Sequence, residues 1–120
     1  MAEMVSRIER YRSCAITCAQ THYASVESVC EHNLAANEMR RLAGDSTAVE
    51  ELSPLLDDPI ARRWLAFHLV EFHSLDEEVE RRCLRIIGEL AAGKGAEGLG
   101  AKSWLQGHGY LPLHPAPDGV

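Results

Sequence analysis

Apolar residues recur three or four positions apart along most of this chain, and this spacing limits the fold more than any other feature. Residues at that spacing share one face of an α-helix, whereas a half-buried strand needs strict alternation of apolar and polar residues. Alternation never persists here, and runs of β-branched residues are absent. Ala, Leu, Glu and Arg, which are strong helix formers, dominate the composition. The sequence therefore predicts an all-α protein.

Start and stop signals divide this pattern into six predicted helices. Proline destabilises a helix interior, so the third helix should be short or kinked at Pro54. The first two helices should form an antiparallel hairpin with a turn around residues 22–25. The predicted ranges are 3–21, 26–43, a short helix from Thr47, 59–71, 74–92 and 96–106.

The chain has 120 residues, which suits one domain. We expect a single helical domain over residues 1–107, built as the hairpin followed by two further helix pairs. An irregular tail should follow over residues 108–120, where three prolines are spread among few helix formers.

Three of the predicted helices begin with a capping signal. Thr47 and Ser74 each precede a glutamate by three positions, which fits the capping box. Asp58 is followed by Pro59, and these residue types favour the N-cap and the first helical position.

The apolar pattern also predicts which residues form the core. The helix at 59–71 is apolar on much of its circumference, so we expect it to be the central helix. On the helix at 26–43 the residues predicted to be buried are Val26, Val29, Cys30, Leu34, Met39 and Leu42.

The charge is unevenly distributed along the chain. There are 18 acidic residues against 12 lysines and arginines, a formal charge of −6. This balance argues against a nucleic-acid partner, because phosphate binding needs clustered basic residues. Residues 44–92 hold eleven acids and five arginines, which accounts for the whole excess. The segment is either a solvated surface or a docking face for a basic partner.

The sequence also indicates a location. No apolar run approaches the roughly 20 residues of a membrane helix, and the charged N-terminus lacks the apolar core of a signal peptide. We therefore expect a cytoplasmic protein with no membrane contact, in which the four cysteines stay reduced.

The segment Leu55-Leu56-Asp57-Asp58-Pro59, with Arg62-x-Trp64-x-Ala66-x-His68-Leu69 after it, resembles a HEAT-repeat unit. The likeness is closest to a small bacterial HEAT-like domain family of unknown function, and it extends more weakly over residues 4–107. It implies an α-α superhelix and a role as a small protein-binding factor, including immunity proteins that neutralise secreted toxins. It carries over no catalytic residue.

A second hypothesis uses the cysteines. Cys14, Cys18 and His22 are spaced four apart, so they would share one stripe of a helix, and Cys30 could close a site from the next helix. Thiolate and imidazole are ligands for zinc or copper. Free cysteine also packs as a small apolar group, so a metal or redox site and simple core packing both remain open.

Other patterns do not indicate chemistry. Glycines at 93, 95, 98 and 100 formally match a dinucleotide fingerprint, which requires a preceding strand that is not predicted here. His68 fits a structural histidine, and the paired carboxylates stand at helix starts, where capping explains them.

We therefore predict a non-enzymatic protein that has no cofactor and binds another protein. We expect this partner to be basic, and the resemblance implies that it is a toxin. A homodimer formed through the first helix is a further alternative. The predicted partner-binding residues are Glu50, Glu51, Asp57, Glu71 and Glu80.

Overall fold

The computed structural model describes residues 6–21 and 25–110, and these residues form helices joined by short turns and loops, with no strand among them. The predicted all-α fold is confirmed. The start predicted at residue 3, most of the turn around 22–25 and residues 111–120 of the tail lie outside the described residues. The elements are α1 (Arg7–Ala19), α2 (Val26–Ala43), α3 (Ala48–Leu52), the 3-10 helix η1 (Ser53–Asp57), α4 (Arg62–Phe72), α5 (Glu77–Ala91) and α6 (Gly95–Gly107).

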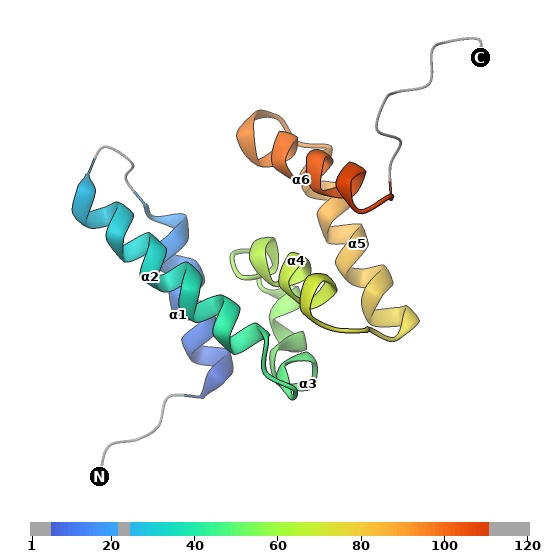
Figure 1. The fold of residues 1–120 in the computed structure, drawn as a ribbon, viewed down its shortest axis with the longest axis horizontal. Helices are drawn as coiled ribbons and strands as arrows, with labels where there is room; N and C mark the ends of the chain where they lie inside the picture. Colours follow the sequence, from blue (N-terminus) through green and yellow to red (C-terminus); the bar gives the residue numbers. More distant parts are fainter. Residues whose placement is uncertain (1–5, 22–24, 111–120) are drawn as a thin grey trace.

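The α1–α2 hairpin lies at one side of the molecule and the α5–α6 pair at the other, with α3 and α4 between them (Figure 1). The α1–α2 hairpin contacts α3 and α4, and α4 in turn contacts α5, which pairs with α6. The predicted central position of α4 is confirmed, since α4 contacts α2, α3, η1 and α5. Its buried residues include Leu65, Ala66 and Leu69.

The segment between α3 and α4 follows from its proline and its aspartate. The α-helix ends at Leu52 and continues as η1, with Pro54 in the first turn, where no N–H is needed. The carboxylate of Asp58 then accepts hydrogen bonds from the backbone nitrogens of Ile60 and Ala61, at 2.9 and 3.0 Å. Asp58 therefore caps the turn before α4, but the predicted helix start at Asp58-Pro59 is wrong, because α4 begins at Arg62 with Ala61 as its N-cap.

Both predicted capping boxes are wrong. Thr47 makes no side-chain cap, because its hydroxyl lies 2.7 Å from carboxylate oxygens of Asp45 and Glu51 instead. At α5 the cap is Asp76, whose carboxylate accepts from the backbone nitrogen of Val79 at 2.9 Å. Because α5 begins at Glu77, Ser74 lies two residues too early for this role.

The predicted core face of α2 is also partly wrong. Met39 and Leu42 are buried as expected, but Val26 and Leu34 are 79% and 71% exposed and Cys30 is exposed. The helix carries apolar residues on two sides, and it packs on α1, α3 and α4 through the side that holds Ala35, Met39, Leu42 and Ala43.

The glycines before and within α6 allow a close approach of backbones rather than nucleotide binding. Gly95 has a φ of +86°, which favours glycine. At Gly98, a Cβ would lie 2.1 Å from the backbone oxygen of Gly93. The first turn of α6 can therefore fold back on the end of α5 only with glycine at position 98.

Candidate functional site

The five acids predicted to bind a partner lie on four elements. Glu50 and Glu51 belong to α3, Asp57 to η1, Glu71 to α4 and Glu80 to α5. All but Glu50 make side-chain contacts with residues distant in the sequence. These acids therefore hold helices together in addition to carrying charge.

Glu51 of α3, Asp45 just before this helix and Asp57 of η1 are engaged with arginines. Arg7 of α1 lies 3.7 Å from Glu51 and 2.6 Å from Asp45 in the α2–α3 turn. Hydrogen bonds from Thr47 and the Arg7 guanidinium lower the pKa of Asp45 to about 2. Asp57 accepts a hydrogen bond from Arg82 at 2.7 Å. These neutralised pairs offer little charge to a partner.

The acids of α4 and α5 instead hold aromatic side chains at the surface. The indole nitrogen of Trp104 donates to the Glu71 carboxylate at 2.7 Å. The hydroxyl of Tyr110, just after α6, donates to the Glu80 carboxylate at 3.3 Å. Partial burial, with the charge of Glu80 second, raises the pKa of Tyr110, so this hydroxyl keeps its proton.

The rings themselves form a stacked group. Trp104 stacks on His108 with centroids 4.0 Å apart and lies nearly parallel to Tyr110 at 5.9 Å. Phe67 of α4 meets Trp104 edge-on at 5.3 Å. We call Glu71, Glu80, Trp104, His108 and Tyr110 the acidic aromatic face.

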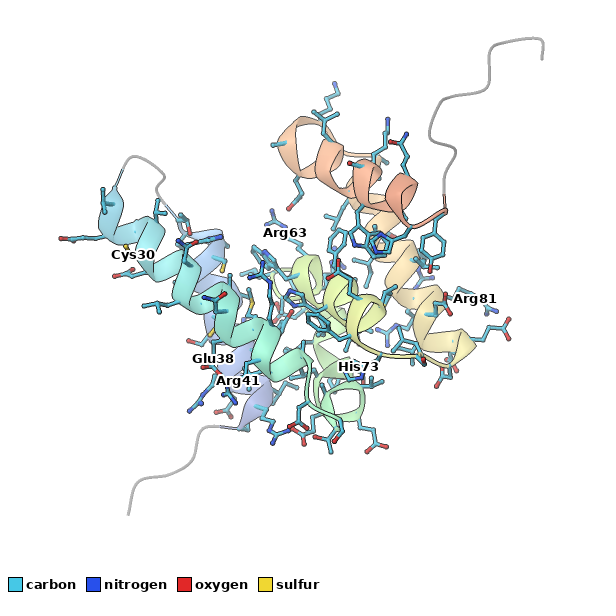
Figure 2. All side chains as sticks on the ribbon, viewed as in Figure 1. Cys30, Glu38, Arg41, Arg63, His73 and Arg81 are labelled. Carbon is cyan, nitrogen blue, oxygen red and sulfur yellow. The ribbon has the colours of Figure 1, made fainter. Side chains whose placement is uncertain are left out.

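Charge around this face is strongly negative. Residues 71–81 hold five acids and one arginine, a net charge of −4. That arginine, Arg81, projects from the start of α5 (Figure 2) and pairs with Glu77 at 2.9 Å, with both side chains largely exposed. Most of the excess charge of the chain therefore lies in the segment that contains Glu71 and Glu80.

A surface pocket of about 300 Å³ adjoins this face. His73, labelled in Figure 2, lies at its wall, where its Nε2 is 2.6 Å from the backbone oxygen of Ala43. The pocket is lined by Val70, His73, Ser74, Leu75, Glu80 and Tyr110. It could take an aliphatic or cationic side chain next to the Tyr110 ring.

Sequence reasoning identified the two acids of this face but not its rings. Neither Trp104 nor Tyr110 was among the predicted partner-binding residues. The signal that was present is a pair of aromatic residues in a segment otherwise rich in glycine and polar residues. Nothing local indicates that Trp104 meets Glu71, which precedes it by 33 positions.

The cysteines predicted for a metal site do not converge. The sulfur of Cys18 faces α2, 3.8 Å from the backbone oxygen of His32. Cys30 lies on the opposite side of α2 from His32, because two residues turn a helix by about 200°. Burial raises the pKa of both Cys14 and Cys18, which favours the thiol over the metal-binding thiolate. Within the part of the chain that is described, no three His, Cys, Asp or Glu side chains form a metal-sized group; His22 lies outside it.

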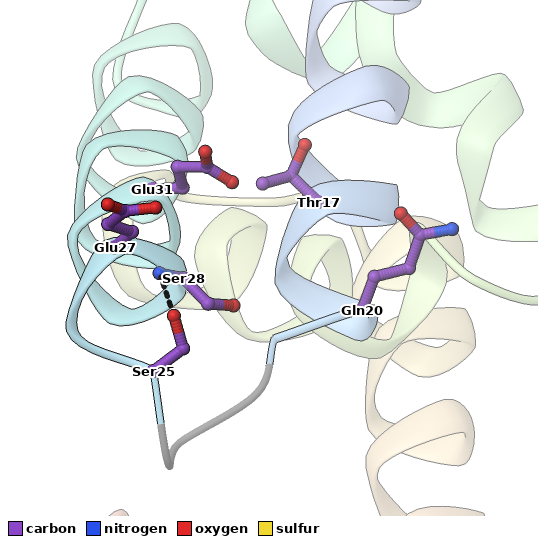
Figure 3. A pocket seen from close by; sticks show the side chains of 6 residues that line it. All are labelled: Thr17, Gln20, Ser25, Glu27, Ser28 and Glu31. Carbon is purple, nitrogen blue, oxygen red and sulfur yellow. Dashed lines mark hydrogen bonds between the residues drawn. The ribbon is translucent and has the colours of Figure 1, made fainter.

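A second hollow lies between the ends of α1 and α2 (Figure 3). It measures about 630 Å³ and is lined by Thr17, Gln20, Ser25, Glu27, Ser28 and Glu31. These six side chains are hydroxyls, an amide and carboxylates, with no imidazole, thiol or cation among them. Hydroxyl, amide and carboxylate groups of this kind can hydrogen-bond water or a polar ligand.

His68 is a structural histidine, as predicted. Its Nδ1 lies 2.7 Å from the hydroxyl of Tyr11, and both side chains are buried. The ring of His68 also stacks on Phe72 at 5.8 Å. This pair ties α1 to α4 across the core.

Comparison with protein families, with curated proteins and with solved structures finds no match to this chain. Among the described residues, no helix combines the length and the apolar character needed to cross a membrane.

Proposed function

We propose that this protein is a non-enzymatic binding module whose acidic aromatic face takes a basic segment of another protein. The observation that carries the proposal is that Glu71 and Glu80, which belong to the most acidic stretch of the chain, hydrogen-bond the half-buried Trp104 and the exposed Tyr110. Tryptophan and tyrosine are enriched among the residues that dominate binding energy at protein interfaces.

The chemistry of the face suits an arginine or lysine side chain. Each carboxylate uses one oxygen for its aromatic partner, and an ionised carboxylate can accept further hydrogen bonds from a cation. The exposed rings of Tyr110 and His108 offer flat surfaces next to these carboxylates, and tyrosine attracts cations through its ring face. The surrounding negative charge would speed association with a basic partner.

The helix-pair arrangement supports a finer version of this proposal, a HEAT-like module that inhibits a toxin. Stacked helix pairs present extended surfaces to protein partners. An inhibitor needs only such a surface and no catalytic group. In this version the partner is a basic toxin protein that the acidic aromatic face covers.

The first test is an amide NMR titration with a short peptide of alternating arginine and glycine, and with its glutamate counterpart. Saturable shifts centred on residues around Trp104 and Tyr110, with the arginine peptide only, would support the proposal. Tyr110→Leu should weaken binding about fivefold, the equivalent of an exposed cation–π contact of about 1 kcal/mol. Shifts spread evenly over all acidic residues would contradict it.

Matched variants separate this face from general acidity. Glu80→Gln and Glu89→Gln each remove one charge from α5, but only Glu80 belongs to the face. Glu80→Gln should weaken peptide binding, and Glu89→Gln should leave it nearly unchanged. Glu50→Gln tests the α3 acids in the same way. Equal weakening by all three would mean that only net charge matters.

The second test uses the native host. The protein should capture a basic protein from lysate at low salt, and the Glu71→Gln/Glu80→Gln variant should not. If the captured protein is toxic when expressed alone, co-expression of the wild-type chain should restore growth. Capture that is equal with both proteins would rule out this face as the binding surface.

A further inference from the structure

The outer side of α2 carries an apolar stripe that the monomer leaves uncovered. Val26, Cys30 and Leu34 are spaced four apart, so they lie along one side of the helix. All three are exposed. Figure 2 places Cys30 in the first half of α2, and Glu38 and Arg41 in its second half.

Two of the charges along the same side, one acidic and one basic, lie at equal distances from Leu34, and the acidic Glu38 lies between Leu34 and the basic residue. Glu27, Leu34 and Arg41 are seven residues apart, which is close to two helical turns, so they share a stripe. Glu27 is exposed, and the Arg41 side chain is 62% exposed even though it hydrogen-bonds Glu38. The stripe therefore has an acid before its central leucine and a base at the same distance after it.

We infer that this side of α2 binds the same side of a second copy of the chain, antiparallel, in a symmetric dimer. A two-fold axis near Leu34 places the leucines of the two copies together. It also places Glu27 of each copy opposite Arg41 of the other, whereas a parallel arrangement would set like charges against each other. An interface that uses one patch twice is what two-fold symmetry requires.

Among the described residues of α1 and α2, the alternative apolar surface is less suitable. On α1 the apolar residues Tyr11, Ala15 and Cys18 are buried inside the monomer, so a dimer through the first helix would have to disrupt the core. The α2 side needs no rearrangement.

Sedimentation of the full chain over a range of concentrations, with a reducing agent present, tests the inference. A concentration-dependent dimer is expected, and it should dissociate more readily at high salt. Leu34→Glu should raise the dissociation constant by about tenfold or more. The control is Leu99→Glu on α6, because Leu99 is 69% exposed, nearly the same as Leu34. A monomer at every concentration, or equal weakening by the two variants, would overturn the inference.

Charge exchange tests the antiparallel register. Glu27→Arg and Arg41→Glu should each weaken the dimer, and the double variant should recover it, since opposite charges face each other again. Failure of the double variant to recover would overturn this register. A Cys30→Ser/Leu34→Cys variant should form a disulfide-linked dimer under mild oxidation, because residues on the axis come within disulfide range.

The dimer and the proposed function can fail independently. The stripe lies on α2, whereas the acidic aromatic face is built from α4, α5 and the end of α6. Leu34→Glu should therefore leave binding of the arginine peptide unchanged, and Tyr110→Leu should leave the dimer intact.

Discussion

The buried Tyr11–His68 pair predicts that the fold loses stability as the pH falls below neutrality. The hydroxyl of Tyr11 lies 2.7 Å from Nδ1 of His68, inside the contact between α1 and α4. Protonation of His68 would bring a charge into the core. Burial lowers the pKa of His68 to about 4; the charge of Glu71 opposes this shift and that of Arg40 adds to it.

The size of the effect follows from the two protonation states. An unfolded chain has the ordinary histidine pKa of 6.5, so the unfolded state takes up the proton first as the pH drops. The stabilising contribution is therefore complete above about pH 7 and is lost progressively as the pH falls toward 4. The shift corresponds to about 3 kcal/mol in total, of which about 2 kcal/mol is lost by pH 5.

Urea unfolding followed by tryptophan fluorescence, at about pH 7, 6 and 5, measures this loss. His68→Gln is the informative variant, because glutamine can still hydrogen-bond Tyr11 but does not titrate. The wild-type chain should lose about 2 kcal/mol more than this variant between pH 7 and pH 5.

His108→Gln replaces the exposed histidine just after α6 and serves as the control, which should keep the wild-type pH dependence. Parallel loss of stability in the wild type and in His68→Gln would refute the reasoning. It would mean that other groups, and not the buried imidazole, cause the acid sensitivity.

Three further predictions concern stability and reactivity. Gly98→Ala should destabilise the fold by about 2 kcal/mol, because its Cβ would overlap a backbone oxygen. Gly100→Ala, with open space around its Cβ, should stabilise α6 by up to about 1 kcal/mol. Thermal unfolding distinguishes the two variants. Asp58→Ala should cost about 1–2 kcal/mol in urea unfolding, since two backbone N–H groups lose their acceptor. The exposed Cys30 should react with a thiol reagent in the folded protein. Cys83 should react only after unfolding, because it is buried and burial raises its pKa to about 11. Mass spectrometry of the labelled peptides identifies each cysteine.

Features that depend on neighbouring residues were predictable from the sequence. The α2 helix spans the predicted residues, and the last two helices begin and end within a few residues of the predicted bounds. Asp58 caps the turn before α4 because a carboxylate followed by proline leaves the next N–H groups free to reach it. The two wrong capping boxes show that local prediction fails where nearby residues compete for one role. The Thr47 hydroxyl bonds Asp45 instead of capping α3, and Asp76 caps α5 in place of Ser74.

The candidate site could be predicted only in part, for a related reason. The sequence located the excess charge in the middle of the chain, and Glu71 and Glu80 lie there. It could not separate them from Glu51 and Asp57, whose charges are neutralised by arginines far along the chain. Only the packed helices decide which acid meets an arginine and which meets an aromatic ring.

The sequence by itself determined the helical class, the bounds of most helices and the segment that carries the charge, because periodicity and capping act within a few residues. The tertiary structure decided which side of α2 is buried, why glycine is required at Gly98 and how Glu71 reaches Trp104. Contacts of this kind join residues far apart in the chain, so no local pattern encodes them. A helix with two apolar sides must bury one of them, and its neighbours determine which one remains to bind a partner.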